Sequence, residues 1–192
     1  MPEMQPLRGV AQNDWAVTGM MGQRERRFLS SIYLDPAQEE EANLRMMRRW
    51  QEVEANEVRF KEYYLDDADL VVVGFGSAGR VALSAVRAAR AQGIKVGLLR
   101  PITVAPFPKQ VLAELIGRTR GFLVAEMNGG QMLDDVMAVV KDYAPVEFYG
   151  RPGGVVPFPD EILAEIERMA NNPLPTQGHP RDRWLARASR LN

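Results

Sequence analysis

The sequence contains no cysteine, and this absence excludes several kinds of functional site. Without thiols, the chain cannot form disulfides, thiolate zinc sites or cysteine-ligated iron–sulfur clusters. Histidine is nearly absent as well. The one histidine, His179, lies in a tail rich in proline, glycine and asparagine, which is typical of a solvated residue rather than of a metal ligand or a general base. We therefore predict no metal site in this chain.

Two further features are missing, an excess of positive charge and a long apolar run. The net charge of the 192-residue chain is −1, whereas a protein that binds the phosphate backbone presents a basic surface. No apolar run approaches the roughly 18 residues that a membrane-spanning helix requires. The N-terminus also lacks the apolar core of a signal peptide. We therefore expect no nucleic-acid partner, no membrane partner and a cytoplasmic location.

What the sequence does contain is a division into four segments with different patterns. They are an irregular linker segment at 1–34, a long amphipathic helix at 35–65, an α/β domain at 66–170 and a tail with a short amphipathic end at 171–192. Asp35 and Pro36 suit the N-cap and the first position of the helix. Apolar side chains spaced three to four residues apart form one stripe of the helix, which packs along its own domain or against another subunit. The stripe consists of Met46, Trp50, Val53, Phe60 and Tyr64, and Glu57 interrupts it between Val53 and Phe60.

The segment 66–170 alternates short apolar runs with helical patterns. Each run is continuously apolar, as in strands that are buried on both faces of a sheet. The runs are Leu70–Val73, Val96–Leu99, Phe122–Ala125 and Val146–Tyr149. Strands that alternate with helices favour right-handed crossovers and parallel pairing. The expected fold is α/β, an open, mostly parallel sheet with helices on both faces, preceded by the long helix and the irregular N-terminal segment.

The first of these strands runs into a glycine turn, Gly74–Gly79, with the Gly-x-Gly-x-x-Gly spacing of dinucleotide-binding folds. In those folds the second strand ends in an acidic residue that binds the ribose hydroxyls, whereas here it ends in Arg100 and Pro101. We therefore interpret the segment as a tight strand-to-helix turn. The alternative hypothesis is a small NADP-binding Rossmann-like protein that uses Gly74–Gly79, with Arg100 as the partner of the NADP phosphate.

Polar side chains follow the third and fourth strands, at the edge where open α/β sheets bind ligands and partners. They are Glu126, Asn128, Gln131 and Arg151. Glu126 is followed by Asn-Gly-Gly-Gln, which is equally compatible with capping of the next helix, and we favour capping over catalysis. Ser77 lies in the glycine turn without a histidine partner. No residue is therefore assigned as catalytic or as cofactor-binding.

Four stretches, in this order and spacing, resemble a known family. They are Gly74–Arg80, Gly97–Thr103 with Pro106–Pro108, Glu126–Met132 and Glu147–Pro157. Together they resemble the second domain of the α subunit of 2-oxoacid:ferredoxin oxidoreductases, closest to the 2-oxoisovalerate (branched-chain) and 2-oxoglutarate types. That domain has the transketolase C-terminal fold. The resemblance covers about Asp14 to Met169.

The resemblance implies the oxidative decarboxylation of a 2-oxoacid to acyl-CoA by a hetero-oligomer, with ferredoxin as the electron acceptor. It places thiamine diphosphate and Mg²⁺ on a β subunit, and iron–sulfur clusters on a cysteine-bearing subunit. The first domain of the α subunit is expected to be absent from this sequence, so a further partner is a chain that carries this domain. We expect the present chain to be inactive alone and to supply a structural, docking domain.

The resemblance also indicates where docking takes place, namely at the strand-end loops. The candidate interdomain or subunit contacts are Gly74, Gly76, Ser77, Arg80, Glu126, Asn128, Gln131 and Arg151. An apolar surface with Trp15, Trp50 and Phe60 is expected to cause self-association, including homodimer contacts, or to require partners. A third hypothesis is a stand-alone binding module of the same fold.

Overall fold

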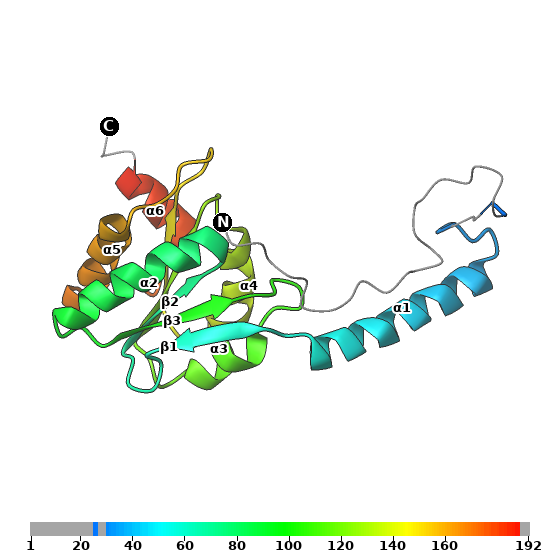
Figure 1. Cartoon of the computed structure of the whole chain (residues 1–192), viewed down its shortest axis with the longest axis horizontal. Helices are drawn as coiled ribbons and strands as arrows, with labels where there is room; N and C mark the ends of the chain where they lie inside the picture. Colours follow the sequence, from blue (N-terminus) through cyan, green and yellow to red (C-terminus); the bar gives the residue numbers. More distant parts are fainter. Residues whose placement is uncertain (1–24, 27–29, 189–192) are drawn as a thin grey trace, which may run out of the picture. The chain divides into compact units, whose positions relative to one another are not determined.

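The structure, a computed structural model, describes residues 25–26 and 30–188 (Figure 1). The chain divides into two compact units, 1–45 and 46–192. None of the helices in the described ranges is long and apolar enough to cross a membrane.

Helix α1 (Pro36–Asn56) begins where the capping pattern predicts. The Asp35 carboxylate accepts a hydrogen bond of 3.0 Å from the Ala37 N–H, one of the amides that the first turn of a helix leaves unpaired. The predicted start of this helix is therefore confirmed. The linker expected before it, with Trp15, lies mostly outside the described residues.

A five-stranded sheet forms the centre of the second unit. Its strands are β1 (Phe60–Tyr63), β2 (Leu70–Gly74), β3 (Val96–Pro101), β4 (Gly121–Glu126) and β5 (Val146–Gly150). Their order is β1-β3-β2-β4-β5, in which β2 to β5 are parallel and β1 pairs with β3 in the antiparallel sense. The predicted α/β fold with a mostly parallel sheet is confirmed, and the four predicted strands all lie within it.

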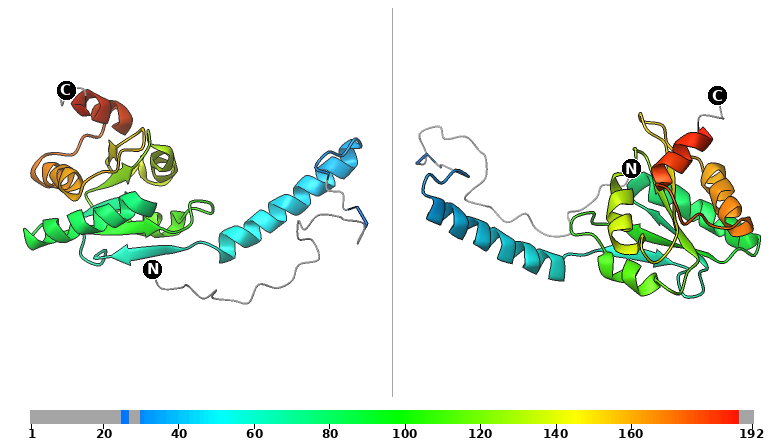
Figure 2. Two further views of the ribbon diagram at one scale, coloured as in Figure 1. Left: turned by 45° about the horizontal axis from the view of Figure 1, so that its top comes forward. Right: turned by 180° about the vertical axis from the view of Figure 1, so that it is seen from behind.

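Helices cover both faces of this sheet (Figures 1 and 2). They are α2 (Gly76–Ala91) and α5 (Pro159–Asn171) on one face, and α3 (Lys109–Leu115) and α4 (Gln131–Val140) on the other. Successive side chains of a strand serve the two cores in turn, so that Val72 packs with α2 and α5 while Val71 and Val73 pack with α3 and α4. Because both faces are covered, the strands are apolar along their whole length.

The long helix predicted for 35–65 is wrong at its end, because α1 stops at Asn56 and the chain then enters β1. The segment around β1 is rich in aromatic side chains, which favour strands. Pairing with β3 satisfies the backbone groups of alternate residues in this segment, and the Ile102 N–H donates to the Arg59 C=O at 2.8 Å. Phe60 also continues the apolar stripe of a helix, so spacing alone does not distinguish the two structures.

The predicted tail contains a helix, α6 (Pro180–Ala188), that packs against β5. Trp184 of this helix meets Phe148 of β5 edge to face, with ring centroids 5.3 Å apart and planes at 78°. His179, expected to be solvated, is half-buried before the helix, where its Nδ1 accepts a hydrogen bond from the Arg181 N–H. The description of 171–192 as a tail is therefore corrected, because this segment contains helix α6, which packs against the outer strand β5.

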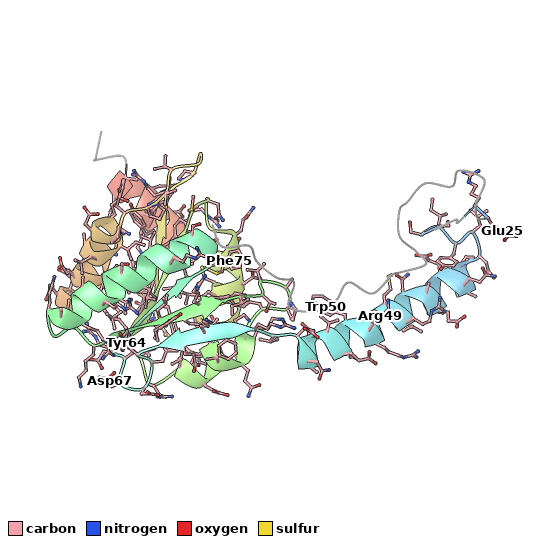
Figure 3. The ribbon with its side chains drawn as sticks, viewed as in Figure 1. Glu25, Arg49, Trp50, Tyr64, Asp67 and Phe75 are labelled. Carbon is pink, nitrogen blue, oxygen red and sulfur yellow. The ribbon has the colours of Figure 1, made fainter. Side chains whose placement is uncertain are left out.

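One arginine holds the turn from β1 to β2 against α2. Arg90 donates hydrogen bonds to the Asp67 carboxylate and, at 2.9 Å, to the Tyr64 C=O. Its guanidinium also lies 5.0 Å from the centre of the Tyr64 ring, within the range of a cation–π contact. Figure 3 shows Tyr64 and Asp67 together at this turn. These contacts fix Tyr64 in a left-handed backbone conformation, φ 57°.

We expect the Asp67 carboxylate to titrate below its ordinary range. The hydrogen bond from Arg90 lowers the pKa of Asp67 from the usual 3.8. Because the folded pKa lies below the unfolded one, the pair stabilises the fold above about pH 4, and this contribution is lost as the pH falls through the folded pKa. A carboxyl NMR titration should show a midpoint that returns toward 3.8 in Arg90→Gln. An unchanged midpoint in that variant would contradict the pairing.

Candidate interface at the carboxyl edge of the sheet

The glycine turn Gly74–Gly79 connects β2 to α2 at the carboxyl end of the parallel strands. Gly76 begins the helix at φ +57°, a left-handed conformation that glycine adopts without strain. A Cβ on Gly79 would lie 2.3 Å from the Gly74 C=O oxygen, so helix and strand approach closely only with glycine here. Phe75 projects from the turn with 43% of its surface exposed (Figure 3). The turn is thus built for close packing of α2 on β2.

Arg100, the phosphate partner in the NADP hypothesis, lies beside this turn. Its Cγ is 3.1 Å from the position that a Cβ on Gly79 would take. Its Nε is buried and has no hydrogen-bond partner among residues 25–26 and 30–188. The strand that carries it ends in Arg100 and Pro101, without the acidic residue that would bind a ribose. The structure therefore places Arg100 beside the glycine turn, as the NADP hypothesis requires. The acidic residue that the same hypothesis needs at the end of β3 is missing.

Glu126, at the end of β4, caps helix α4. Its two carboxylate oxygens accept hydrogen bonds from the Met132 and Leu133 N–H groups at 2.9 and 3.0 Å. Asn128 supports this cap, since its side-chain amide donates to Glu126 at 3.1 Å and its side-chain oxygen accepts from the Gly130 N–H at 2.7 Å. A carboxylate at a helix N-terminus also interacts favourably with the helix dipole. The capping interpretation is confirmed, and Glu126, 5% exposed, offers little surface to a partner.

Replacing Glu126 by alanine is expected to destabilise the fold by about 3 kcal/mol, because two buried amides lose a charged acceptor. Urea or thermal unfolding measures the loss. Gln131→Ala is the matched control, since Gln131 is exposed at the start of the same helix and should change stability by less than about 0.5 kcal/mol. Equal stabilities of the two variants would argue against the cap.

Arg151 follows β5 and faces the start of α5. Its guanidinium lies 3.4 Å from Glu161, whose carboxylate also accepts a 2.7 Å hydrogen bond from the Phe158 N–H. Burial, together with the hydrogen bond to Glu161, raises the pKa of Tyr149 above its ordinary value. The Arg151 Nε is buried and unpaired within the part of the chain that the structure describes. These contacts fasten the two ends of the loop 151–158 to α5.

Large apolar side chains gather in the loops at the carboxyl ends of the strands. The carboxyl-edge patch, as we name it, consists of Phe75 after β2, Ile102 and Val104 after β3, and Val155, Val156 and Phe158 after β5, each 43–61% exposed. In the loops at the opposite edge, Tyr64 and Tyr143 are the exposed large side chains of this kind among the described residues. Exposed apolar surface of this extent marks interaction sites, so the carboxyl edge is the candidate interface.

The predicted contact residues all lie at this edge but differ in exposure. Gly74 and Glu126 are buried, Gly76, Asn128 and Arg151 are half-buried, and Ser77, Arg80 and Gln131 are exposed. The carboxyl-edge patch was not among them, because an apolar residue in a loop gives no sign in the sequence of whether it is buried. Trp50 and Phe60, expected at an apolar surface, are 45% and 37% exposed. Their contact with a partner stays a prediction.

Sequence reasoning missed a buried ionic cluster around Glu147 of β5, whose side chain is fully buried. Three arginines surround its carboxylate: Arg168 of α5 at 2.5 Å, and Arg183 and Arg187 of α6 at 2.7 and 3.2 Å. Glu165 pairs with Arg168 and Arg187. Burial disfavours the charge on Arg168, but the two carboxylates outweigh it, and the pKa of Arg168 is raised. The available signal was a lone acidic residue inside an apolar strand, which requires a partner.

Several known proteins are similar to this domain in sequence. Residues 68–163 match the family described as pyruvate:ferredoxin oxidoreductase core domain II. The ketoisovalerate oxidoreductase subunit VorB of Methanothermobacter thermautotrophicus is 40% identical over 82% of this chain and 44% of its own length. The 2-oxoglutarate synthase subunit KorA of Methanothermobacter marburgensis is 39% identical over 55% of this chain and 28% of its own length. The chain thus spans less than half of the length of these relatives.

A solved structure shares the fold. The 2-oxoglutarate:ferredoxin oxidoreductase from Magnetococcus marinus superimposes with a TM-score of 0.62 at 21% identity, over 71% of this chain and 24% of that one. The family match at 68–163 makes up half of the 192 residues and includes the glycine turn, the capped helix α4 and the loop after β5. The chain belongs to the pyruvate:ferredoxin oxidoreductase core domain II family.

Proposed function

We propose that this chain supplies the second core domain of a 2-oxoacid:ferredoxin oxidoreductase and does not turn over substrate alone. The reaction of the whole enzyme is the oxidative decarboxylation of a 2-oxoacid to acyl-CoA, with ferredoxin as the electron acceptor. Family membership supports this proposal, as do relatives that are named as subunits of ketoisovalerate oxidoreductase and 2-oxoglutarate synthase.

The substrate that we propose is a 2-oxoacid of the 2-oxoisovalerate or 2-oxoglutarate type. The VorB relative aligns with 82% of this chain and the KorA relative with 55%, at nearly equal identity.

The cofactors are proposed to lie on partner chains. Because the sequence has no cysteine, it cannot supply the thiolates that hold iron–sulfur clusters. The family resemblance places thiamine diphosphate and its Mg²⁺ on a β subunit. A thiamine-binding β subunit and an iron–sulfur subunit are therefore the partners that the reaction requires.

The carboxyl-edge patch is the observation that carries the proposed role. Its six side chains lie on loops that follow three different strands at one edge of the sheet. Removing apolar surface from water stabilises a contact by about 25 cal/mol per Å². We assign this patch to the contact with the first domain of the α subunit or with the β subunit. The chain would then act by positioning its neighbours and not by chemistry of its own.

Reconstitution tests this function directly. The full chain is co-expressed with a thiamine-diphosphate-binding β chain, an iron–sulfur chain and a chain that carries the first domain. We expect the four to elute together in size-exclusion chromatography and to reduce ferredoxin with 2-oxoisovalerate and coenzyme A, while the chain alone shows no activity. If the chain is a stable monomer that does not bind these partners, the result would instead favour the stand-alone binding module.

The patch itself is tested by a charge within it. Phe158→Glu is expected to weaken assembly by about tenfold or more, because a carboxylate would replace the most exposed aromatic side chain of the patch. Leu185→Glu is the matched control, since Leu185 is 51% exposed on α6, outside the patch. Pull-down of the partner chains at increasing concentration measures both variants. Equal assembly of the two variants would remove the patch from the interface.

A second candidate function is NADP binding, because the Arg100 side chain lies beside the glycine turn and its buried Nε has no hydrogen-bond partner among the described residues. Nicotinamide fluorescence during a titration with NADPH distinguishes it. We expect no saturation, because no acidic residue ends β3. Saturable binding at micromolar concentration that Arg100→Leu abolishes would favour the NADP hypothesis over the oxidoreductase subunit.

A further inference from the structure

A groove of about 690 Å³ lies beside β1, within the second unit of the chain. Its walls are the end of α1, the strand β1 and the start of α3. Apolar side chains line it, among them Val58, Phe60 and Phe107. The groove is separate from the carboxyl-edge patch and shares no residue with it.

The strand that borders this groove has an open edge. Among the described strands, β1 has β3 as its one neighbour. The Ile102 N–H donates to the Arg59 C=O, and Lys61 lies opposite Arg100 in the same register. In an antiparallel pair, alternate residues direct their N–H and C=O groups toward the partner strand. The backbone groups of Phe60 and Glu62 therefore point away from the sheet.

The side chains of the same two residues face the groove. Phe60 and Glu62 both line it, whereas Tyr63 packs on the opposite face of the sheet with α2 and α5. An extended peptide next to β1 would thus meet unpaired backbone groups on one side and a groove lined by both apolar and acidic side chains on the other. This is the arrangement in which an added strand binds to the edge of a sheet.

Charge selects the kind of strand that fits. Three carboxylates border the groove, those of Glu54, Glu62 and Glu114, and one cation, Lys109, lies 3.7 Å from Glu54. The Gln110 side-chain amide donates to Glu114 at 3.0 Å, which leaves its negative charge in place. The groove is therefore acidic at its border, and complementary charge on the partner favours binding.

A second copy of this chain fits poorly at the same edge. If two copies paired through β1 about a two-fold axis, the outward N–H and C=O groups of Phe60 and Glu62 in one copy would bond those of the same two residues in the other copy. Only three registers meet this condition. Centring the pair on Lys61 places two lysines opposite each other, and centring it on Glu62 places two carboxylates opposite each other. Centring it on Phe60 places Lys61 opposite Arg59. Like charges directly opposite each other are destabilising, so each of these registers is disfavoured.

We propose that the open edge of β1 binds an extended segment of a partner protein, rich in lysine or arginine with apolar residues between them, as a sixth strand of the sheet. The partner's backbone pairs with Phe60 and Glu62, its apolar side chains enter the groove, and its basic side chains meet Glu62 and Glu114. This surface is additional to the carboxyl-edge patch and does not depend on the function proposed above.

Two synthetic peptides test the proposal on the full chain, one of alternating lysine and valine and one of alternating glutamate and valine, each about seven residues long. Amide NMR follows the binding. The lysine peptide should bind about tenfold more tightly than the glutamate peptide. It should also slow the hydrogen exchange of the Phe60 and Glu62 amides and leave that of Lys61 unchanged, since this amide is already paired with β3.

Three substitutions separate charge from backbone pairing. Glu62→Lys should weaken the lysine peptide about tenfold, whereas Glu52→Lys, an equal change on an exposed residue outside the groove, should leave it bound. Glu62→Gln and Glu62→Pro both lose the carboxylate, but only proline loses the outward N–H. The proline variant should bind more weakly than the glutamine variant while its thermal midpoint stays close, because the ladder to β3 is untouched.

The results that would overturn the proposal are equally defined. Binding that Glu52→Lys weakens as much as Glu62→Lys would show attraction to the overall charge of the chain. Protection of the Phe60 and Glu62 amides without peptide, rising with protein concentration, would assign the edge to a second copy. Absence of binding to both peptides would make β1 a short strand that ends the sheet without a partner.

Discussion

Replacing Gly79 by alanine is expected to lower the free energy of unfolding by about 3 kcal/mol or more. The added methyl group would lie 2.3 Å from the Gly74 C=O oxygen and 2.8 Å from its carbon, so the backbone of β2 or α2 must move. Strand β2 resists such a shift, because it is paired on both sides and contributes to both cores. For a chain of this size the thermal midpoint should fall by roughly 6–12 °C.

Gly129→Ala is the control for this experiment. A Cβ on Gly129 meets no atom within 4 Å, and its backbone is not left-handed, so its stability should change by less than about 0.5 kcal/mol. Gly76→Ala should fall between the two, since it has free space but a φ of +57° and costs about 1–2 kcal/mol. Circular dichroism during thermal unfolding ranks the three. Equal thermal midpoints of Gly79→Ala and Gly129→Ala would contradict the close approach of α2 to β2 at Gly79.

The parallel part of the sheet could be predicted because its environment leaves a local mark on the sequence. A strand covered by helices on both faces has no polar face, so Leu70–Val73 and Phe122–Ala125 appear as continuous apolar runs. The glycine turn carries a second local mark, since the close approach of helix and strand at Gly79 excludes every side chain. Both features depend on the helices that pack on the strands, and such helices are present in every α/β sheet of this class.

Strand β1 and helix α6 could not be predicted in the same way, because each depends on a distant partner. Residues 60–63 are mostly exposed and gain their strand conformation from pairing with β3. Their aromatic side chains also fit the helical spacing of the preceding segment. Helix α6 is short and polar overall, and it is held in place by contacts such as that of Trp184 with Phe148, 36 residues earlier. Neither partner is visible in a local window of sequence.

The features of the candidate site also differ in whether they depend on neighbours that are close or distant in the sequence. Capping by Glu126 was predictable, because the carboxylate and the amides of Met132 and Leu133 are six and seven residues apart. The exposure of Val156 and Phe158 was not, because an apolar loop is buried or exposed according to what covers it. The arginines around Glu147 lie 21 to 40 residues away in two different helices, so the acid alone gave no indication of its partners.

Glu147→Gln is expected to cost about 3–5 kcal/mol, because removing one member of a buried ion pair leaves the other charge without compensation. Glu147 is fully buried and lies within 3.2 Å of three guanidinium groups. Glutamine keeps the shape, but its amide nitrogen would face donors. Glu165 still balances Arg168 and Arg187, whereas Arg183 has Glu147 as its carboxylate partner among the described residues. The loss should therefore fall most heavily on Arg183.

Because Arg183 belongs to α6, the effect should be local as well as global. Hydrogen exchange of the α6 amides should accelerate more than that of β2, since Arg183 and Trp184 hold this helix to β5. Glu41→Gln is the matched control: Glu41 pairs with Arg45 at 3.0 Å but is 72% exposed, and water screens such a pair. Uniform acceleration of both elements, or equal stability of the two variants, would show that Glu147 is not what fastens α6. The expected pattern instead makes the buried Glu147 carboxylate one of the links between the sheet and α6.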